Sequence, residues 1–181
     1  MLYGMINMSY LKNLLLVEGE TEEKFLKDFK SNLKIQTKIK IFNLAQNDFK
    51  LNIYGKRYNI VSVILDSDIF NKDTISRINK NLKMLNANKI NIYIQNKNFE
   101  DELAKSLEEC KRTKDLYRLF GCEDNSSTEF KRKFLKVSDL SLKNNFKVNF
   151  YKLYCNNNEF NKKIKVGKIQ TGKQLFRKEF I

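Results

Sequence analysis

Acidic residues follow three short apolar stretches of the chain. The first stretch ends at Glu18, the second at Asp66 and Asp68, and the third shortly before Glu100. If these stretches are parallel strands, their carboxyl ends meet at one edge of a sheet, where α/β proteins bind their ligands. Asp66 and Asp68 are one residue apart, so an extended backbone points both to the same face. Converging carboxylates repel one another and favour a divalent cation, and oxygen-only ligands select Mg²⁺ or Mn²⁺.

The composition narrows this chemistry, because the 181 residues include no His. Ser-His-Asp and Cys-His catalysis are excluded, as are zinc sites that use His. The three Cys stand at wide spacings and are odd in number, which indicates neither a disulfide framework nor a CxxC metal site. Acid–base or metal chemistry must therefore use carboxylates, Lys, Tyr or water.

Each acidic group also has a purely structural interpretation. Glu22 and Glu23 fall in the first turn of an expected helix, where acids stabilise the positive end of the helix dipole. Asp is frequent in turns, so the pair Asp66 and Asp68 is a weak signal when taken alone. Glu100 likewise fits the first turn of another helix. The repetition of acids at three strand ends is what favours a shared site.

The elements that would position these acids alternate along the first 110 residues. Short apolar runs predict strands at 14–17, 38–42, 60–65 and 90–94. Helical spacing of apolar residues predicts helices between them, with Thr21 capping the first helix and a last helix over 99–110. Residues 43–58 are expected to form a short helix and a loop. This alternation predicts an α/β fold with a mostly parallel sheet flanked by helices.

The C-terminal third has shorter helical patterns and a different charge. Residues 111–181 carry 18 basic and 7 acidic residues, whereas residues 1–110 carry 17 and 14. Ser126 to Glu129 match a capping box, which predicts a helix with Phe130, Phe134 and Leu135 facing inward. Residues 148–154 fit a strand or a helix. Apolar residues between 164 and 169 indicate that part of the basic tail packs as a strand.

The net charge of +14 favours nucleic acid as a partner, although a chain rich in Lys, Asn and Ile also fits the coding bias of an AT-rich genome. The cations expected to contact nucleic acid are Lys97, Lys165, Lys168, Lys173 and Arg177. The longest apolar run near the start, Leu14–Val17, is too short to cross a bilayer. Without a leader pattern and with Cys residues that fit free thiols, we expect a soluble, cytoplasmic protein with no membrane partner.

Two segments of the sequence resemble the signatures of a known family. LLLVEGETEEKF at 14–25 and ILDSDI at 64–69 resemble the two signatures of Toprim domains, a Glu-Gly after the first strand and a DxD after a later one. Glu22 and QNKNFEDEL at 95–103 are similar to the branch that holds OLD-type (overcoming lysogenization defect) nucleases and the small RloB-like proteins. The resemblance covers roughly residues 12–110. It implies a Toprim-like (Rossmann-like) catalytic core over 1–110, with residues 111–181 as a basic, mainly helical extension packed on the same domain.

Carried over residue by residue, the resemblance implies that Glu18, Asp66 and Asp68 are the catalytic metal ligands. Glu22 and Glu100 would complete a second position for Mg²⁺ or Mn²⁺. Glu18 would help to activate water, and Lys97 or Lys173 would offset charge on the phosphate. The sequence has no GxxxxGK(S/T) motif, so an ATPase or other defence-system subunit would be a separate partner.

The residues and the resemblance leave three functions open. The first is a divalent-metal-dependent nuclease, an endonuclease or exonuclease, that acts on DNA or RNA, and the resemblance implies a role for it in a prokaryotic antiviral defence system. The second is an RNA-processing Toprim ribonuclease that resembles the ribosomal-RNA maturases. The third is a non-catalytic Toprim module that binds nucleic acid or regulates a partner. Metal-dependent cleavage separates the first two from the third, and the choice of substrate separates the first from the second.

Overall fold

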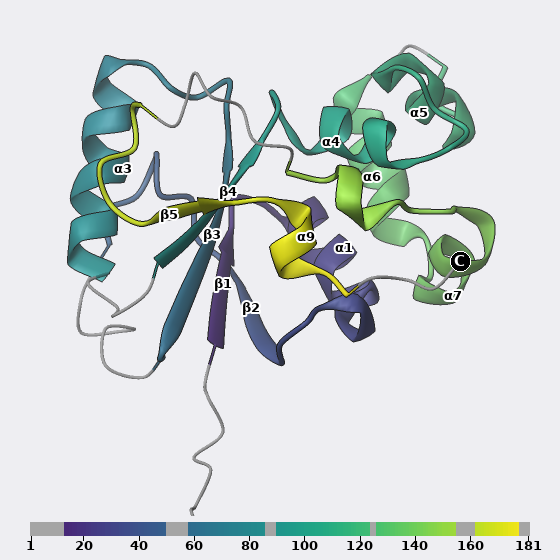
Figure 1. Cartoon of the computed structure of the whole chain (residues 1–181). Helices are drawn as coiled ribbons and strands as arrows, with labels where there is room; N and C mark the ends of the chain where they lie inside the picture. Colours follow the sequence, from purple (N-terminus) through teal and green to yellow (C-terminus); the bar gives the residue numbers. More distant parts are fainter. Residues whose placement is uncertain (1–12, 50–57, 86–89, 124–125, 155–161, 178–181) are drawn as a thin grey trace, which may run out of the picture.

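The computed structural model describes residues 13–49, 58–85, 90–123, 126–154 and 162–177. The described strands form a five-stranded sheet in the order β2-β1-β3-β4-β5, and each neighbouring pair is parallel. The strands are β1 Asn13–Val17, β2 Thr37–Ile41, β3 Ile60–Asp66, β4 Ile90–Gln95 and β5 Lys168–Gln170. Figure 1 shows helices on both faces of this sheet. The layers are those of a Rossmann-like α/β fold, and this prediction is confirmed.

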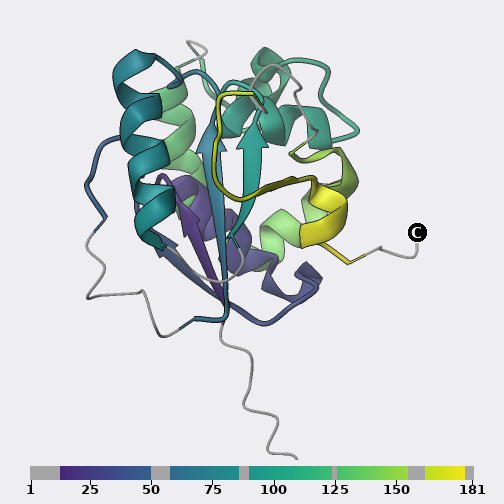
Figure 2. The same ribbon diagram turned by 60° about the vertical axis from the view of Figure 1, so that its left-hand side comes forward.

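Helix α3 covers one face of the sheet, and the other described helices gather on the opposite side (Figures 1 and 2). The helices are α1 Glu20–Asp28, α3 Lys72–Leu85, α4 Phe99–Ser106, α5 Thr113–Leu119, α6 Ser127–Lys136, α7 Asp139–Asn145 and α9 Gly172–Leu175. Two 3-10 turns are also present: η1 Lys30–Asn32 lies between α1 and β2, and η2 Phe150–Lys152 lies between α7 and β5. No helix among those described is both long enough and apolar enough to span a membrane.

The alternation of side chains along the central strands divides the core into two hydrophobic clusters. On β1, Leu15 and Val17 pack with the side chains of α1, α4 and α6, whereas Leu14 and Leu16 pack with those of α3. Residues 61–65 of β3 are all buried, as expected for a parallel strand covered on both faces. The carboxyl ends of β1, β3 and β4 are therefore held at one edge by packing on both sides.

The C-terminal third contributes the last strand of the sheet. Lys168 of β5 is in register with Asn91 of β4, and Ile164, Val166 and Ile169 pack against the cluster around α3. The strand expected in the tail is confirmed around Ile169, whereas Ile164 and Val166 precede β5 and lie outside it. The undecided stretch 148–154 contains η2, so it is neither a strand nor a full helix.

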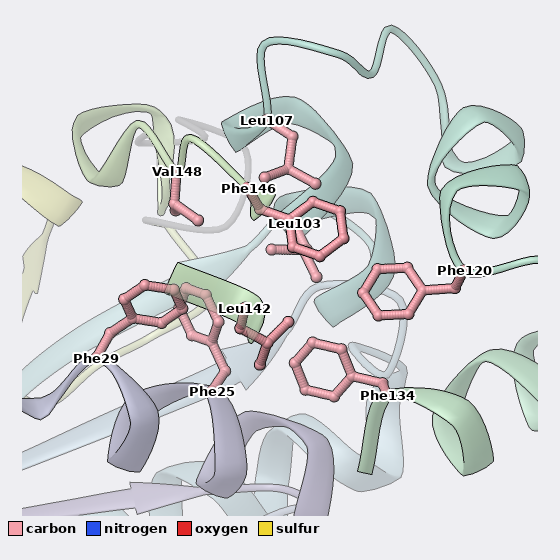
Figure 3. A pocket seen from close by; sticks show the side chains of 9 residues that line it. All are labelled: Phe25, Phe29, Leu103, Leu107, Phe120, Phe134, Leu142, Phe146 and Val148. Carbon is pink, nitrogen blue, oxygen red and sulfur yellow. The ribbon is translucent and has the colours of Figure 1, made fainter. Parts of the chain in front are cut away.

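Aromatic side chains fill the space between α1, α4, α6 and α7. Figure 3 shows Phe120, Phe134 and Phe146 gathered on one side of a small cavity, with Phe25 and Phe29 lying together on the other. This cavity holds about 10 Å³ and is lined by apolar side chains alone. A space of that size admits one water molecule at most and offers it no hydrogen-bond partner. It is a packing gap in the core and not a ligand site.

Several local predictions differ from the structure. Thr21 does not cap α1, because Gly19 holds the extended cap position and the helix already begins at Glu20. The predicted helix 99–110 ends at Ser106, since Leu107 adopts an extended conformation. Leu135 is 37% exposed, because the buried side of α6 is set by the two Phe residues at positions 130 and 134.

The remaining local predictions fall on turns and caps. Ser126 caps α6 as expected, with its Oγ accepting a hydrogen bond from the Glu129 N–H at 3.3 Å. Residues 43–49 form a turn and no helix, because Asn43 Oδ1 accepts hydrogen bonds from the backbone N–H groups of Ala45 and Gln46. Residues 50–57, the rest of the expected helix and loop, lie outside the described residues.

Gly172 provides a test of how the tail docks. A Cβ at this position would lie 2.4 Å from the carbonyl oxygen of Phe150 and 2.5 Å from that of Leu153. These are backbone atoms that cannot turn aside, so Gly172→Ala should lower the free energy of unfolding by about 1–3 kcal/mol. Urea denaturation measures the change. Lys173→Ala, at the exposed next position, is the matched control and should have little effect; equal stability of Gly172→Ala and the wild type would contradict this docking.

Candidate metal centre

Glu18 and Asp66 lie side by side at the carboxyl ends of two adjacent strands. Glu18 follows the last residue of β1, and Asp66 is the last residue of β3. The backbone N–H of Asp66 donates a hydrogen bond to Glu18 Oε1 at 3.3 Å. Asn43, in the turn after β2, donates from Nδ2 to Glu18 Oε2 at 3.3 Å. The Glu18 carboxylate is thus held by both of the strands that flank it in space.

The turn that carries Asn43 is fastened to the opposite layer by a buried amide. Asn81 of α3 is fully buried, and its Nδ2 donates to the carbonyl oxygens of Leu44 at 2.8 Å and Asn47 at 2.7 Å. Its Oδ1 accepts from the backbone N–H of Phe49 at 2.8 Å. This amide therefore stabilises the turn from which Asn43 reaches the carboxylate of Glu18.

The first turns of two helices add two further carboxylates. Glu22 of α1 and Glu100 of α4 are 6% and 2% exposed. Thr21 Oγ1 donates to Glu22 Oε2 at 3.2 Å, and Ser127 Oγ donates to Glu100 Oε1 at 2.6 Å. Both helices begin at the carboxyl edge of the sheet, where their positive ends favour negative side chains.

Three hydrogen bonds, here called the bracket, join the DxD segment (residues 66–68) to the loop after β4. The N–H groups of Ser67 and Asp68 donate to the carbonyl oxygen of Lys97 at 3.0 and 3.3 Å, and Lys97 N–H donates to Ser67 Oγ at 2.7 Å. Lys97 adopts a left-handed conformation with φ 67°, which is uncommon for a residue other than Gly. The bracket places the exposed Lys97 directly beside Asp68.

Burial, with a smaller part from mutual repulsion, raises the pKa values of Glu18, Asp66, Glu22 and Asp68. Burial, with smaller contributions from Glu22 and Asp68, raises the pKa of Glu18 to about 7. Burial and then the charge of Glu18 raise the pKa of Asp66 to about 9, and Glu22, Asp68 and Glu100 add to the effect. The pKa values of Glu22 and Asp68 are raised in the same direction, mainly by burial. The acids that the sequence singles out therefore interact as one electrostatic group.

The chemistry of this group fits a hard divalent cation. Asp66 Oδ1 is buried and has no hydrogen-bond partner among the described residues, and the surrounding donors are carboxylate oxygens, which Mg²⁺ and Mn²⁺ prefer. The arrangement is not a ready-made ligand set, since no three acidic or Cys side chains of the described residues converge closely enough to hold a metal ion. The hydroxyl groups of Thr21 and Ser127 hold two of the five carboxylates in their present positions.

The basic residues expected at the site divide into two groups. Lys97 lies at the acidic edge, whereas Lys165 is tied by its backbone N–H to Asn79 of α3. Lys168 is aligned with the second residue of β4, and the carbonyl oxygen of Lys173 accepts from Lys34, which precedes β2. Arg177 donates from Nε to the Leu33 carbonyl oxygen at 3.1 Å. Lys168, Lys173 and Arg177 therefore lie nearer to the beginnings of the strands than the carboxylates do.

Two residues of α6 complete the acidic edge and were not expected there. Lys131 Nζ lies 3.6 Å from Glu100 Oε1, the same atom that accepts from Ser127. Lys131 also lowers the pKa values of Glu22 and Asp68. Ser127 and Lys131 are four residues apart, a spacing that places both on one side of a helix. That spacing can be seen in the sequence, but their contact with Glu100 depends on how α6 packs.

The comparisons with known proteins identify no family for this chain. No family model matches the chain, no curated protein matches it, and no solved structure matches it. The resemblance to Toprim domains therefore rests on the sequence motifs, and the function rests on the arrangement described above.

The raised pKa values predict how the stability of the metal-free protein depends on pH. Asp66 loses its proton near its ordinary pKa when unfolded but only near pH 9 when folded. Stability should therefore fall as the pH rises between these values, by up to about 1.4 kcal/mol per pH unit. Asp66→Asn removes this cost, so its gain in stability over the wild type in EDTA should grow from pH 5 to about pH 8. The measurement is urea denaturation at each pH, and Asp73→Asn, an exposed acid of α3, is the control. A constant difference between Asp66→Asn and the wild type would contradict the raised pKa.

A second prediction tests the cation directly, without any assay of activity. At pH 8, Mn²⁺ or Mg²⁺ at a hundredfold excess over its dissociation constant should stabilise the wild type by about 2.7 kcal/mol. Asp66→Asn should lose most of this stabilisation, whereas Asp73→Asn should keep it. Thermal unfolding with each metal and with EDTA measures the effect. Equal stabilisation of all three proteins would place the metal elsewhere.

Proposed function

We propose that this protein is a divalent-metal-dependent nuclease of the Toprim type that hydrolyses phosphodiester bonds in DNA or RNA. The observation that carries the proposal is the gathering of Glu18, Asp66, Asp68, Glu22 and Glu100 at the carboxyl edge of a parallel sheet. This is the edge where α/β proteins bind their ligands. The buried, unpartnered oxygen of Asp66 and the high pKa values of its neighbours favour a cation as the missing counter-charge.

The residues of the chain can be given separate parts in such a reaction. Bound Mg²⁺ or Mn²⁺ would supply Lewis-acid activation of the phosphate and of water. Glu18 would accept the proton of the attacking water as a general base. The exposed Lys97 would offset charge on the phosphate from beside the DxD segment.

Lys131 has a different part in this proposal, because it is already paired with Glu100. Its charge offsets part of the rise in the pKa values of Glu22 and Asp68. We therefore treat Lys131 as a residue that positions the acidic group. It is not assigned a contact with the scissile phosphate.

The proposal extends to the cellular role of the nuclease. The motifs resemble those of OLD-type and RloB-like proteins, which favours a role in prokaryotic antiviral defence. A separate ATPase or another defence-system subunit would then be the partner.

The test is cleavage of plasmid DNA and of structured RNA with Mg²⁺, Mn²⁺, Zn²⁺ or EDTA. Cleavage should require Mg²⁺ or Mn²⁺, and Zn²⁺ alone should not support it. Asp66→Asn and Asp68→Asn should each reduce the rate at least about a hundredfold, because each removes a metal-binding charge while keeping the side-chain volume. Asp73→Asn should keep the wild-type rate, and circular dichroism checks the folding of each variant. Cleavage in EDTA, or wild-type rates for both variants, would show that the acidic group is not the active site.

A further inference from the structure

A pocket with many polar side chains lies on the helix-rich face of the sheet, toward the beginnings of the strands. It has a volume of about 160 Å³ and is bounded on one side by α9 and on the other by the strands. Its lining combines the polar or aromatic residues Asn13, Thr37, Ser62, Asn91, Tyr93, Gln170 and Gln174 with the apolar residues Ile35, Ile60 and Leu175. Figure 1 shows α9 following β5 beside the sheet. This polar pocket contributes no residue to the acidic edge.

The polar lining is unusual for a sheet face that packs on helices. Further along the same strands and on the same face, the side chains are the buried Leu15, Val17 and Ile64. Ser62 is 8% exposed and Tyr93 is 3% exposed. Neither of their hydroxyl groups hydrogen-bonds to another described residue, and neither is a fully buried unpaired atom, so both are reached from the pocket. A ligand in the pocket can therefore supply their hydrogen-bond partners.

Cations surround this pocket but do not line it. Lys168 is in register with Asn91, so its side chain leaves the sheet on the same face as the pocket. Lys173 is the neighbour of the lining residue Gln174, and Lys34 donates a hydrogen bond to the carbonyl oxygen of Lys173. The interior is thus neutral and combines amide and hydroxyl groups with apolar side chains, and the rim is positively charged. Two of the amides are already joined, since Gln170 Nε2 donates to Asn91 Oδ1 at 3.4 Å.

This combination defines the chemistry of the ligand. The lining has no carboxylate to hold a cation and no charged group to hold a phosphate inside. Amide and hydroxyl groups beside an aromatic ring suit a flat, neutral heterocycle with several donors and acceptors, and Asn and Gln are the side chains that pair with base edges. The volume is smaller than the 300–1,000 Å³ typical of sites that enclose a whole ligand. The heterocycle would enter, and the charged remainder of the ligand would stay at the rim.

We propose that the polar pocket binds one nucleobase, with the attached phosphate held by Lys168 and Lys173. The base can belong to a free nucleotide or to a nucleic-acid strand, and both sources share this chemistry. The pocket begins at the first residues of the strands, whereas Glu18 follows the last residue of β1, about 17 Å further along. Binding here does not depend on the metal centre.

The experiment measures binding in EDTA, so failure of the metal centre cannot affect it. Short fluorescein-labelled DNA and RNA oligonucleotides are titrated by anisotropy at several salt concentrations. The same measurement is made with an abasic oligonucleotide of equal length, and with AMP and UMP as competitors. The base-bearing oligonucleotide should bind the wild type at least about tenfold more tightly than the abasic one.

The variants separate contacts to the base from contacts to phosphate. Lys168→Glu with Lys173→Glu should weaken binding and lower the slope of log affinity against log salt by about 1.5. Asn91→Leu should weaken binding of the base-bearing oligonucleotide to the level of the abasic one and leave the salt slope unchanged. Gln170→Met, on the edge strand, is a second variant of the lining if Asn91→Leu does not fold. Lys114→Glu, an exposed cation of α5, is the control and should have little effect.

The outcomes distinguish the alternatives. Competition by AMP or UMP supports a pocket for free nucleotides, and oligonucleotide binding without such competition supports a pocket for a base within a strand. Equal binding of the base-bearing and abasic oligonucleotides would overturn the proposal. So would a loss with Lys114→Glu as large as that with the two rim variants, because it would move the basic surface to the helices around α5. Nuclease activity without base-dependent binding would overturn this proposal alone and leave the metal centre standing.

Discussion

The removal of neighbouring carboxylates from water is the constraint on which this structure depends. Asp66 and Glu18 are half-buried side by side at the end of the sheet, and their pKa values rise to about 9 and about 7, mainly through desolvation and further through mutual repulsion. Such an arrangement costs stability whenever the groups are ionised, so the surrounding fold must hold them in place. Two clusters of apolar side chains, one on each face of β1 and β3, provide that support. The bracket between the DxD segment and Lys97 then prevents the acids from moving apart.

Partial positive charges reduce the cost but do not remove it. The backbone N–H of Asp66 points at Glu18, and the first turns of α1 and α4 present their positive ends near Glu22 and Glu100. Lys131 contributes a full charge at 3.6 Å from Glu100, but its side chain is half exposed and its effect is screened by water. One oxygen of Asp66 still has no partner among the described residues. A hard divalent cation is the simplest group that would satisfy it.

Local patterns predicted the parts of the fold that local forces determine. The strand ending at Asp66 was predictable because its apolar, β-branched run is fully buried, and the helix at Ser126 because its cap lies within four residues. Thr21 was wrongly expected to cap α1, since Gly19 can hold the extended cap position just as well. The contacts of Ser127 and Lys131 with Glu100 join residues about thirty positions apart, and no periodicity in the chain encodes them.

The same limit explains the position of the basic tail. The pattern of apolar residues indicated a strand near 169, but it carried no information on which neighbour that strand pairs with or in what register. Pairing β5 in parallel with the first half of β4 places Lys168 beside Asn91 and away from the carboxylates. The chain then turns into α9, whose four residues span about 6 Å along the helix axis. So short a helix cannot cover the face as α1 does with nine residues. The polar side chains of Ser62 and Asn91 therefore line a pocket at this place. A longer helix packed there would have required apolar side chains on the strands beneath it.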